Sequence, residues 1–218
     1  MKALLILSLA MIMLLWGCTS TDGVSGATSD YTEGEIHEYQ GMNLDPAILP
    51  RENSIKGIQQ VDIESYRLKV TGLAEKKMEL KYEEVKSYPS YERLITLHCV
   101  EGWDATILWK GVKLMDIFAD AGVQEGAVTV IFKCADGYTT SMALSVIGQR
   151  DILLAYEANS ATLPPATGYP FIVVAEDKLG YKWARWVEEI ELSDNASYQG
   201  FWESSGYSND AEVPEERK

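Results

Sequence analysis

The segment LITLHCVEGW (residues 94–103) contains the side chains of this chain best suited to metal or redox chemistry. Cys99 follows an apolar run, His98 precedes it, and Glu101 and Trp103 come directly after it. A thiolate is a soft ligand for a metal, and donors beside it can fix its orientation. Free cysteine is also among the most frequently buried residue types, so a small core residue is the alternative interpretation of Cys99.

A second cysteine, Cys134, lies in the apolar run AVTVIFKC (residues 127–134). Two cysteines of an exported domain could form a disulfide. Both cysteines lie inside strand-like runs and not in loops, so we expect free thiols. A structural protein with a Cys99–Cys134 disulfide is kept as the least favoured alternative.

Hydrophobic alternation and turn residues predict the elements that must position these side chains. Strands are predicted over residues 66–73, 92–100, 105–112, 127–134, 151–159, 169–177 and 184–194. Helices are predicted in KYEEVKSY (81–88), which Pro89 ends, and in the amphipathic KLMDIFADAG (113–122). After a turn at Asp136 and Gly137, the chain is expected to return as a strand or an extended segment. The predicted fold class is α+β, with mixed β-sheets and short helices.

Composition and charge narrow the function classes. The 218 residues include 19 basic and 33 acidic side chains, for a formal net charge of −14. Such a surface repels a phosphate backbone, which argues against nucleic acid as a partner. The sequence has no haem-attachment motif, iron–sulfur cysteine cluster or dinucleotide-binding glycine motif. Any electrons must therefore come from, or leave to, an external redox partner such as a cytochrome or a quinol-linked protein.

The N-terminus predicts export and a lipid anchor. Residues 1–17 combine one lysine with a continuous apolar run, as an export signal does. The junction LLWGC resembles a prokaryotic lipobox, which implies cleavage before Cys18 and lipidation of its sulfur; an ordinary signal anchor is the alternative. Residues 18–43 are expected to be a flexible tether, 44–195 the folded domain, and 196–218 a packed extension with a loose charged tail. The expected location is the outer face of the cytoplasmic membrane.

Three segments together resemble the sulfite oxidase superfamily. They are RENSIKG (51–57), LHCVEGWDATILWKGVKLMDIF (97–118) and ILLAYEANSATLPPATGYPFIVVAEDKLGYKWARWVEEIEL (152–192). The resemblance spans about residues 44–207. It implies a domain that holds a molybdenum-pterin (molybdopterin) cofactor, with Cys99 as the protein ligand of the metal. The implied activity is that of an oxidoreductase that transfers an oxygen atom on a small substrate, with sulfur compounds as one class.

The resemblance also implies roles for residues outside the cysteine segment. Arg51 resembles an arginine that faces an anionic substrate and would take part in catalysis. The implied cofactor contacts, besides Cys99, are Asn53, His98, Cys134, Gly180, Tyr181, Lys182 and Arg185. Among them, the turn Gly180–Lys182 with Arg185 is expected to hold the pterin phosphate, because backbone amides and cations suit an anion.

Two positions favour a different function on the same fold. Family members usually have a histidine or asparagine at the position of Thr167 and an arginine at the position of Ile172. The signal segment also has no arginine pair, which exported relatives commonly use to cross the membrane folded. The alternative is therefore a cofactor-free, lipid-anchored binding or scaffold protein in which Cys99 is a relic.

Overall fold

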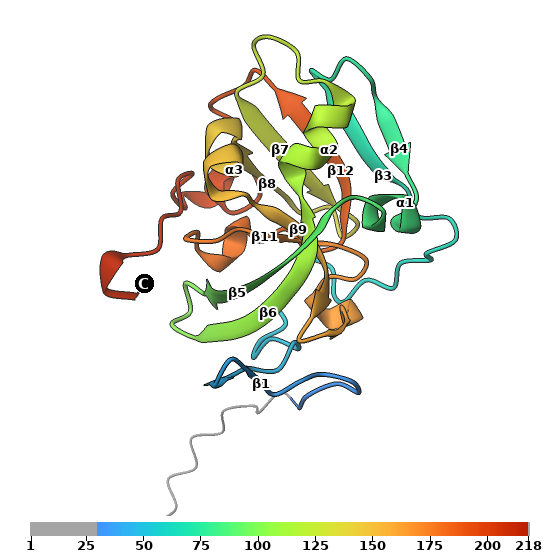
Figure 1. The fold of residues 1–218 in the computed structure, drawn as a ribbon. Helices are drawn as coiled ribbons and strands as arrows, with labels where there is room; N and C mark the ends of the chain where they lie inside the picture. Colours follow the sequence, from blue (N-terminus) through green and yellow to red (C-terminus); the bar gives the residue numbers. More distant parts are fainter. Residues whose placement is uncertain (1–29, 218) are drawn as a thin grey trace, which may run out of the picture.

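The computed structural model describes residues 30–217, which form two five-stranded sheets and a small hairpin (Figure 1). The first sheet has the strand order β10–β9–β6–β5, and β11 also pairs with β9. Its strands are β5 (Ser90–His98), β6 (Asp104–Lys113), β9 (Leu153–Ala158), β10 (Ala161–Thr162) and β11 (Ile172–Val174). The predicted export signal over residues 1–17 and the predicted lipidation site Cys18 lie outside the described residues.

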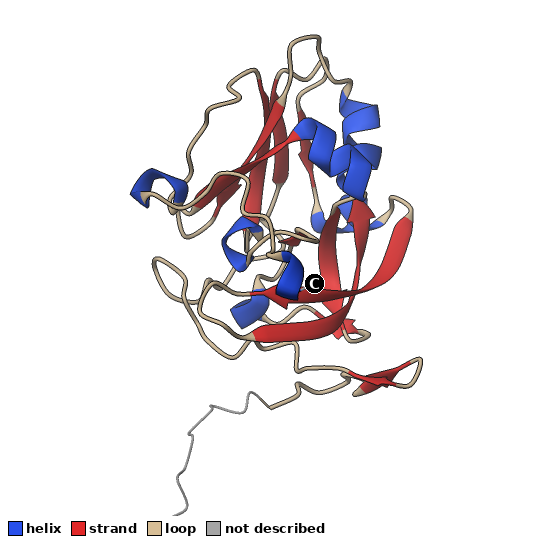
Figure 2. Cartoon of the chain, turned by 90° about the vertical axis from the view of Figure 1, so that its left-hand side faces the viewer, coloured by secondary structure: helices blue, strands red, loops and turns tan. Residues whose placement is uncertain are grey.

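The second sheet has the strand order β4–β3–β12–β7–β8. Its strands are β3 (Leu68–Gly72), β4 (Met78–Leu80), β7 (Thr129–Cys134), β8 (Thr139–Ala143) and β12 (Val187–Ser193). The pairing of β12 with β3 is parallel, and the other pairings in both sheets are antiparallel. Figure 2, turned by 90°, shows the two sheets as separate groups of strands, with short helices at several places around and between them. Mixed sheets with short helices confirm the predicted α+β class.

The helices are few and short. They are α1 (Tyr82–Lys86), α2 (Leu114–Ala121), α3 (Leu144–Arg150) and the 3₁₀ turns η1 (Pro165–Thr167), η2 (Gly180–Lys182), η3 (Glu203–Ser205) and η4 (Glu215–Arg217). Helix α3 was not predicted, because its valine, isoleucine and Gly148 have low helix propensity. No helix within residues 30–217 is long and apolar enough to cross a membrane.

One glycine allows the strands of the first sheet to approach closely. Gly111 lies in β6 at an irregularity of the pairing with β9. A Cβ atom at Gly111 would lie 2.3 Å from the backbone oxygen of Leu154. Any residue larger than glycine at position 111 would therefore push β6 and β9 apart.

The N-terminal part of the described chain differs from the predicted tether. Residues 30–43 include the hairpin β1 (Glu38–Tyr39) and β2 (Met42–Asn43), which lies below β6 in Figure 1. The carboxylate of Glu35 is buried and accepts hydrogen bonds from the amide of Ala47 and the side chain of Asn159, both at 2.8 Å. Composition alone predicted a flexible segment, but this buried carboxylate fixes it to the domain.

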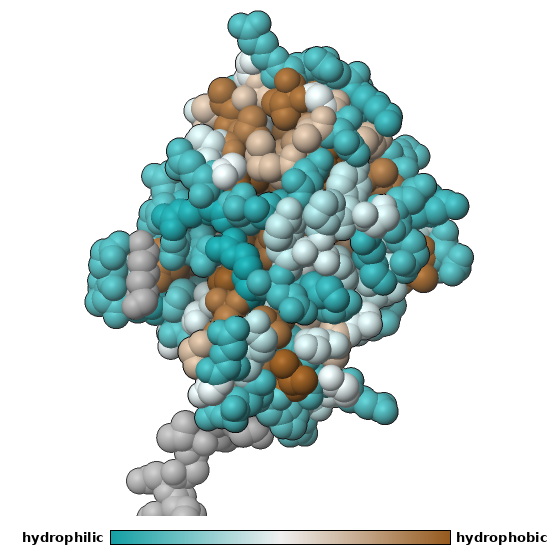
Figure 3. All heavy atoms as spheres, in the orientation of Figure 1, coloured by the Kyte–Doolittle hydropathy of each residue, from teal (hydrophilic) through white to brown (hydrophobic). Residues whose placement is uncertain are grey.

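The face of the molecule in Figure 3 is largely hydrophilic, and its apolar side chains gather mainly near the top of the view. This surface agrees with the acidic composition, because charged side chains remain in water while the two sheets bury the apolar ones. Fully buried side chains of the core include Trp109, Phe118, Phe132 and Phe171.

Candidate active site

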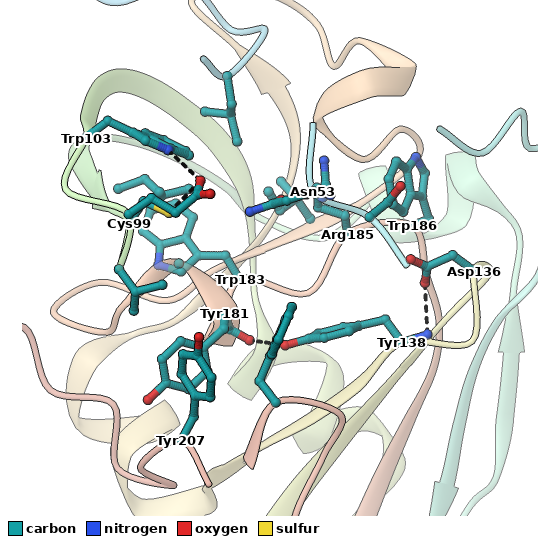
Figure 4. A pocket seen from close by; sticks show the side chains of 18 residues that line it. Asn53, Cys99, Trp103, Asp136, Tyr138, Tyr181, Trp183, Arg185, Trp186 and Tyr207 are labelled. Atoms are coloured by element: carbon teal, nitrogen blue, oxygen red, sulfur yellow. Dashed lines mark hydrogen bonds between the residues drawn. The ribbon is translucent and has the colours of Figure 1, made fainter. Parts of the chain in front are cut away.

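A cavity of about 220 Å³ opens where the end of β5, the β7–β8 turn and η2 meet (Figure 4). The residues that line it come from segments far apart in the sequence. Its aromatic side chains are Trp103, Tyr138, Tyr181, Trp183, Trp186, Trp202 and Tyr207. Its other lining residues include Asn53, Cys99, Glu101, Asp136, Ile172, Gly180 and Arg185. Aromatic walls with a few polar groups are typical of a small-molecule site.

Cys99 reaches the cavity because β5 ends directly before it. The apolar side chains of Ile95 and Leu97 face the core, and period-two alternation places Cys99 on the same face. The loop after the strand is closed by hydrogen bonds from the Cys99 amide to the Trp103 carbonyl (2.9 Å) and from the Gly102 amide to the Cys99 carbonyl (3.1 Å). The sequence therefore fixes both the position and the direction of this thiol.

The surroundings of the Cys99 thiol are suited to a ligand atom. Its Sγ lies 3.8 Å from Oε2 of Glu101, and the same oxygen accepts a hydrogen bond of 3.1 Å from Nε1 of Trp103. Burial raises the pKa of the Cys99 thiol, and the nearby Glu101 carboxylate raises it further, while the backbone N–H of Glu101 and the charge of Arg217 oppose the shift. The free thiol is therefore protonated at neutral pH.

The two cysteines are not joined. Cys99 and Cys134 are both buried and both free, which overturns the disulfide alternative. Cys134 ends β7 and is not among the residues that line the cavity. Burial raises the pKa of its thiol, and the backbone N–H of Arg185 opposes that shift. Because Cys134 is buried and does not line the cavity, its position does not support the predicted direct contact with the cofactor.

His98 also lies elsewhere than predicted. It is the last residue of β5, so alternation points its side chain away from Cys99. Its Nδ1 lies 2.8 Å from Oδ1 of Asp104, across the β5–β6 pair, and it is not among the residues that line the cavity. The structure therefore gives His98 a position in the strand pair and not in the predicted cofactor site.

Arg185 is the buried cation of the cavity wall. Its side chain is 11% exposed, and its guanidinium lies 4.5 Å from the centre of the Trp186 ring. Nη1 donates to the Ala166 carbonyl at 2.9 Å, and Nη2 donates to Glu52 at 3.2 Å and to Asn53 at 3.3 Å. Burial lowers the pKa of the guanidinium, and the Glu52 carboxylate opposes that shift. The structure thus brings together two predicted site residues, Arg185 and Asn53.

The predicted phosphate-binding turn is only partly directed at the cavity. Gly180 and Tyr181 line it, and the Tyr181 carbonyl accepts a hydrogen bond of 2.5 Å from the Tyr138 hydroxyl. Lys182 turns away: its ammonium lies 2.5 Å from Glu203 Oε1 and its side chain is 1% exposed. The prediction that Lys182 holds a phosphate does not fit this geometry, because the ammonium is already paired in the interior.

Arg51 lies at the mouth of the cavity and not inside it. Its side chain is 68% exposed, and Nη1 is 3.8 Å from Oε1 of Glu101. A solvated pair of this kind leaves the guanidinium free to turn toward a ligand. At the two positions that favoured another function, Ile172 lines the cavity, whereas the Thr167 hydroxyl donates to the Ala47 carbonyl at 2.6 Å.

Several lining residues escaped the sequence prediction. Trp183 and Trp186 lie in the quoted segment LGYKWARW but had no assigned role, and Asp136 had been assigned only to a turn. Trp202 and Tyr207 come from the C-terminal extension. The aromatic composition of that extension was the available signal, but only the fold shows which pocket it faces. Within residues 30–217, no three histidine, cysteine or acidic side chains converge as a metal site.

Comparison with known proteins agrees with this geometry. The family model of the oxidoreductase molybdopterin binding domain matches residues 55–202. YuiH of Bacillus subtilis, an uncharacterized oxidoreductase, is 37% identical over 147 residues, which cover 67% of this chain and 74% of that protein. YedZ1 of Azospira oryzae, named as a candidate subunit of a protein-methionine-sulfoxide reductase, is 31% identical over 219 residues, which cover 92% of this chain and 82% of that protein.

The fold also has a solved counterpart. The sulfane dehydrogenase SoxCD from Paracoccus pantotrophus superposes with a TM-score of 0.64 at 20% identity. The match covers 87% of this chain and 57% of the SoxCD chain. The chain therefore belongs to the molybdopterin-binding oxidoreductase family of sulfite-oxidase-type fold, and it is an oxidoreductase whose cofactor is molybdopterin.

Proposed function

We propose that this chain transfers an oxygen atom on a small sulfur compound, with Cys99 as the protein ligand of the cofactor's metal. The observation that carries the proposal is a free thiol on the wall of a cavity that also contains Arg185 and seven aromatic side chains. A soft thiolate suits a high-valent metal that already has dithiolene sulfurs as ligands. When bound, the cofactor supplies the two-electron oxygen-atom chemistry.

The residues present fit such a group on three counts. The contact of the thiol with the Glu101 carboxylate, at 3.8 Å, is weak, and a metal–sulfur bond would replace it. Nη2 of Arg185 is shared between Glu52 and Asn53 at 3.2 and 3.3 Å, so it could turn to an anionic phosphate at little cost. The aromatic walls offer flat apolar surfaces to a flat ring system.

Each residue of the site then has a separate task. Cys99 binds the metal at the end of β5, and the loop hydrogen bonds hold its direction. Glu101, oriented by the indole N–H of Trp103, accepts or returns a proton at Oε2 beside the thiol. Arg185 binds the anionic end of the cofactor, and Arg51 orients the substrate at the mouth.

The charges of the cavity favour an uncharged substrate. Asp136 lines the wall, Glu101 stands beside the thiol, and Arg185, the largely buried cation of the wall, is assigned to the anionic end of the cofactor. A free oxyanion would meet like charges, whereas a sulfoxide is neutral and polarizable. The name of the relative YedZ1, a candidate subunit of a protein-methionine-sulfoxide reductase, supports the same class. With a reduced dye as electron donor for methionine sulfoxide and an oxidised dye as electron acceptor for sulfite, we expect kcat/KM for sulfoxide reduction to exceed that for sulfite oxidation by about tenfold or more. Faster turnover of sulfite would contradict the charge argument.

The proposal also covers the location of the protein and its redox partner. The apolar N-terminal run and the junction before Cys18 support a lipid anchor on the outer face of the cytoplasmic membrane. An external cytochrome or quinol-linked protein would exchange electrons with the site, because the sequence has no haem or iron–sulfur motif. Palmitate labelling of the full chain, absent in Cys18→Ser, tests the anchor.

The deciding experiment is the molybdenum content of the purified full chain. We expect about one molybdenum per chain in the wild type, and almost none in Cys99→Ser, since a serine hydroxyl is a poor replacement for a soft thiolate. The matched control is Cys134→Ser, which changes the other buried cysteine and should keep its molybdenum. Circular dichroism must show that all three proteins are folded.

One observation supports the cofactor-free alternative. Ile172 lines the cavity where family members usually have an arginine, so the site has one cation fewer for a phosphate. Folded wild type without molybdenum, from a host that makes the cofactor, would decide for a binding or scaffold protein.

A further inference from the structure

The C-terminal segment, residues 203–217, lies beyond the family match, which ends at residue 202. It was expected to include a loose charged tail, but the structure places it along the cavity wall. Figures 1 and 2 both show it returning to the open end of β5, where the chain leaves the strand toward Cys99. We call this segment the C-terminal clasp.

The first half of the clasp is fixed to η2 and the loop before it. Glu203 pairs with the ammonium of Lys182 in the interior, and the Tyr181 hydroxyl donates to the Ser208 carbonyl at 2.7 Å. Ala211 and Val213 are almost completely buried. The amide of Leu179 donates to the Ala211 carbonyl at 2.8 Å, and the amide of Val213 donates to the Asp177 carbonyl at 3.0 Å. These contacts make this half of the clasp a part of the folded domain.

The end of the clasp closes on the loop that contains Cys99. Nη1 of Arg217 donates to the Cys99 carbonyl at 3.0 Å, and Nη2 donates to the Trp103 carbonyl at 3.4 Å. Nη2 also forms an ion pair of 2.5 Å with Asp104. The two carbonyls are the same ones that accept the hydrogen bonds closing the loop. One guanidinium therefore binds both ends of the Cys99 loop.

We propose that Arg217 is a positioning residue for Cys99: the clasp connects η2 with the Cys99 loop and holds the thiol in its direction. A planar guanidinium has donors in a fixed fork, so it can restrain two carbonyls at once, whereas an ammonium is a single point donor. The inference rests on the proposed role of Cys99 as metal ligand. The effect on the loop, however, is a property of the chain itself.

The test is amide hydrogen exchange of the protein purified without cofactor, followed by mass spectrometry of peptides that cover the Cys99 loop. In Arg217→Gln we expect the loop amides to exchange about threefold faster or more, because two carbonyl contacts are lost. Arg217→Lys keeps the charge beside Asp104 but not the fork, so its loop exchange should stay raised. The matched control is Arg67→Gln: Arg67 also donates to two backbone carbonyls, but these belong to Glu64 and Tyr66 and not to the Cys99 loop.

A second measurement separates positioning from general stability. In the full chain, Arg217→Gln should lose molybdenum on dialysis about threefold faster or more than the wild type, with a melting temperature close to that of Arg67→Gln. Unchanged loop exchange in Arg217→Gln would overturn the inference, and so would full restoration by Arg217→Lys. Wild type without molybdenum would refute the proposed function, and the exchange result would still decide whether the clasp restrains the loop.

Discussion

Lys182 offers the sharpest quantitative test of the structure. Its ammonium lies 2.5 Å from Glu203 Oε1, 2.9 Å from the Ser141 carbonyl and 2.9 Å from Oδ1 of Asn209. The side chains of Lys182 and Glu203 are 1% and 0% exposed. Burial lowers the pKa of the Lys182 ammonium, and Glu203 opposes the shift. Removing the ammonium would leave a buried carboxylate with only the hydroxyl of Thr140 as a donor.

Lys182→Met should therefore be strongly destabilising. Breaking a buried ion pair by removing one partner costs about 3–5 kcal/mol. With a urea m-value of about 2 kcal/mol/M, the unfolding midpoint should fall by about 1.5–2.5 M. Lys182→Met/Glu203→Leu should recover at least about 2 kcal/mol of that loss, because no unpaired charge is left behind. Lys86→Met, which removes the exposed pair with Glu83, should cost less than about 1 kcal/mol.

The assay is urea unfolding of the three variants and the wild type, followed by tryptophan fluorescence, with molybdenum content measured on the same preparations. A cost below about 1 kcal/mol for Lys182→Met would refute the buried pair. If that variant lost molybdenum at unchanged stability, Lys182 would have the phosphate-binding role that the family resemblance implies. A buried ion pair thus predicts a loss of stability in Lys182→Met, whereas phosphate binding predicts a loss of molybdenum at unchanged stability.

Three further predictions follow from single residues. Burial raises the pKa of the Glu189 carboxyl, but the hydrogen bonds from Lys133 and Thr71 and the charge of Lys133 together outweigh it, so the net pKa is lowered. The carboxylate therefore stabilises the fold above its unfolded pKa of about 4.3. In urea titrations, the wild type should be more stable than Glu189→Gln by less than about 1 kcal/mol at pH 7. This difference should disappear as the pH falls below about 4.3. Gly111→Ala should cost about 2 kcal/mol or more in the same assay, since a Cβ would lie 2.3 Å from the Leu154 oxygen; a neutral result would mean that the strands are farther apart. Alkylation of Cys99 by iodoacetamide without cofactor should have its midpoint above the ordinary thiol value of about pH 8.5, because burial raises the pKa; a lower midpoint would contradict that environment.

The sequence by itself determined the strand that presents Cys99 and the direction of its thiol. Alternation over β5 is a local property, and it places His98 on the face opposite to Cys99, although the family resemblance implied a cofactor contact by His98. The family resemblance and the α+β class could also be predicted from the sequence, because they depend on patterns within segments and on the order of those segments.

Only the tertiary structure decided which basic side chains remain available to bind a ligand in the cavity. Lys182 and Arg185 are three residues apart and equally basic in the sequence, but Lys182 is paired in the interior with Glu203 and Arg185 faces the cavity. The partner that makes the difference comes from the C-terminal extension, and no local pattern indicates where that extension returns. The role of Arg217 also depends on the tertiary structure, because its guanidinium contacts the carbonyl of Cys99, which lies 118 positions earlier in the sequence. Desolvation and long-range pairing set the role of each cation, and both depend on packing that a linear pattern does not contain.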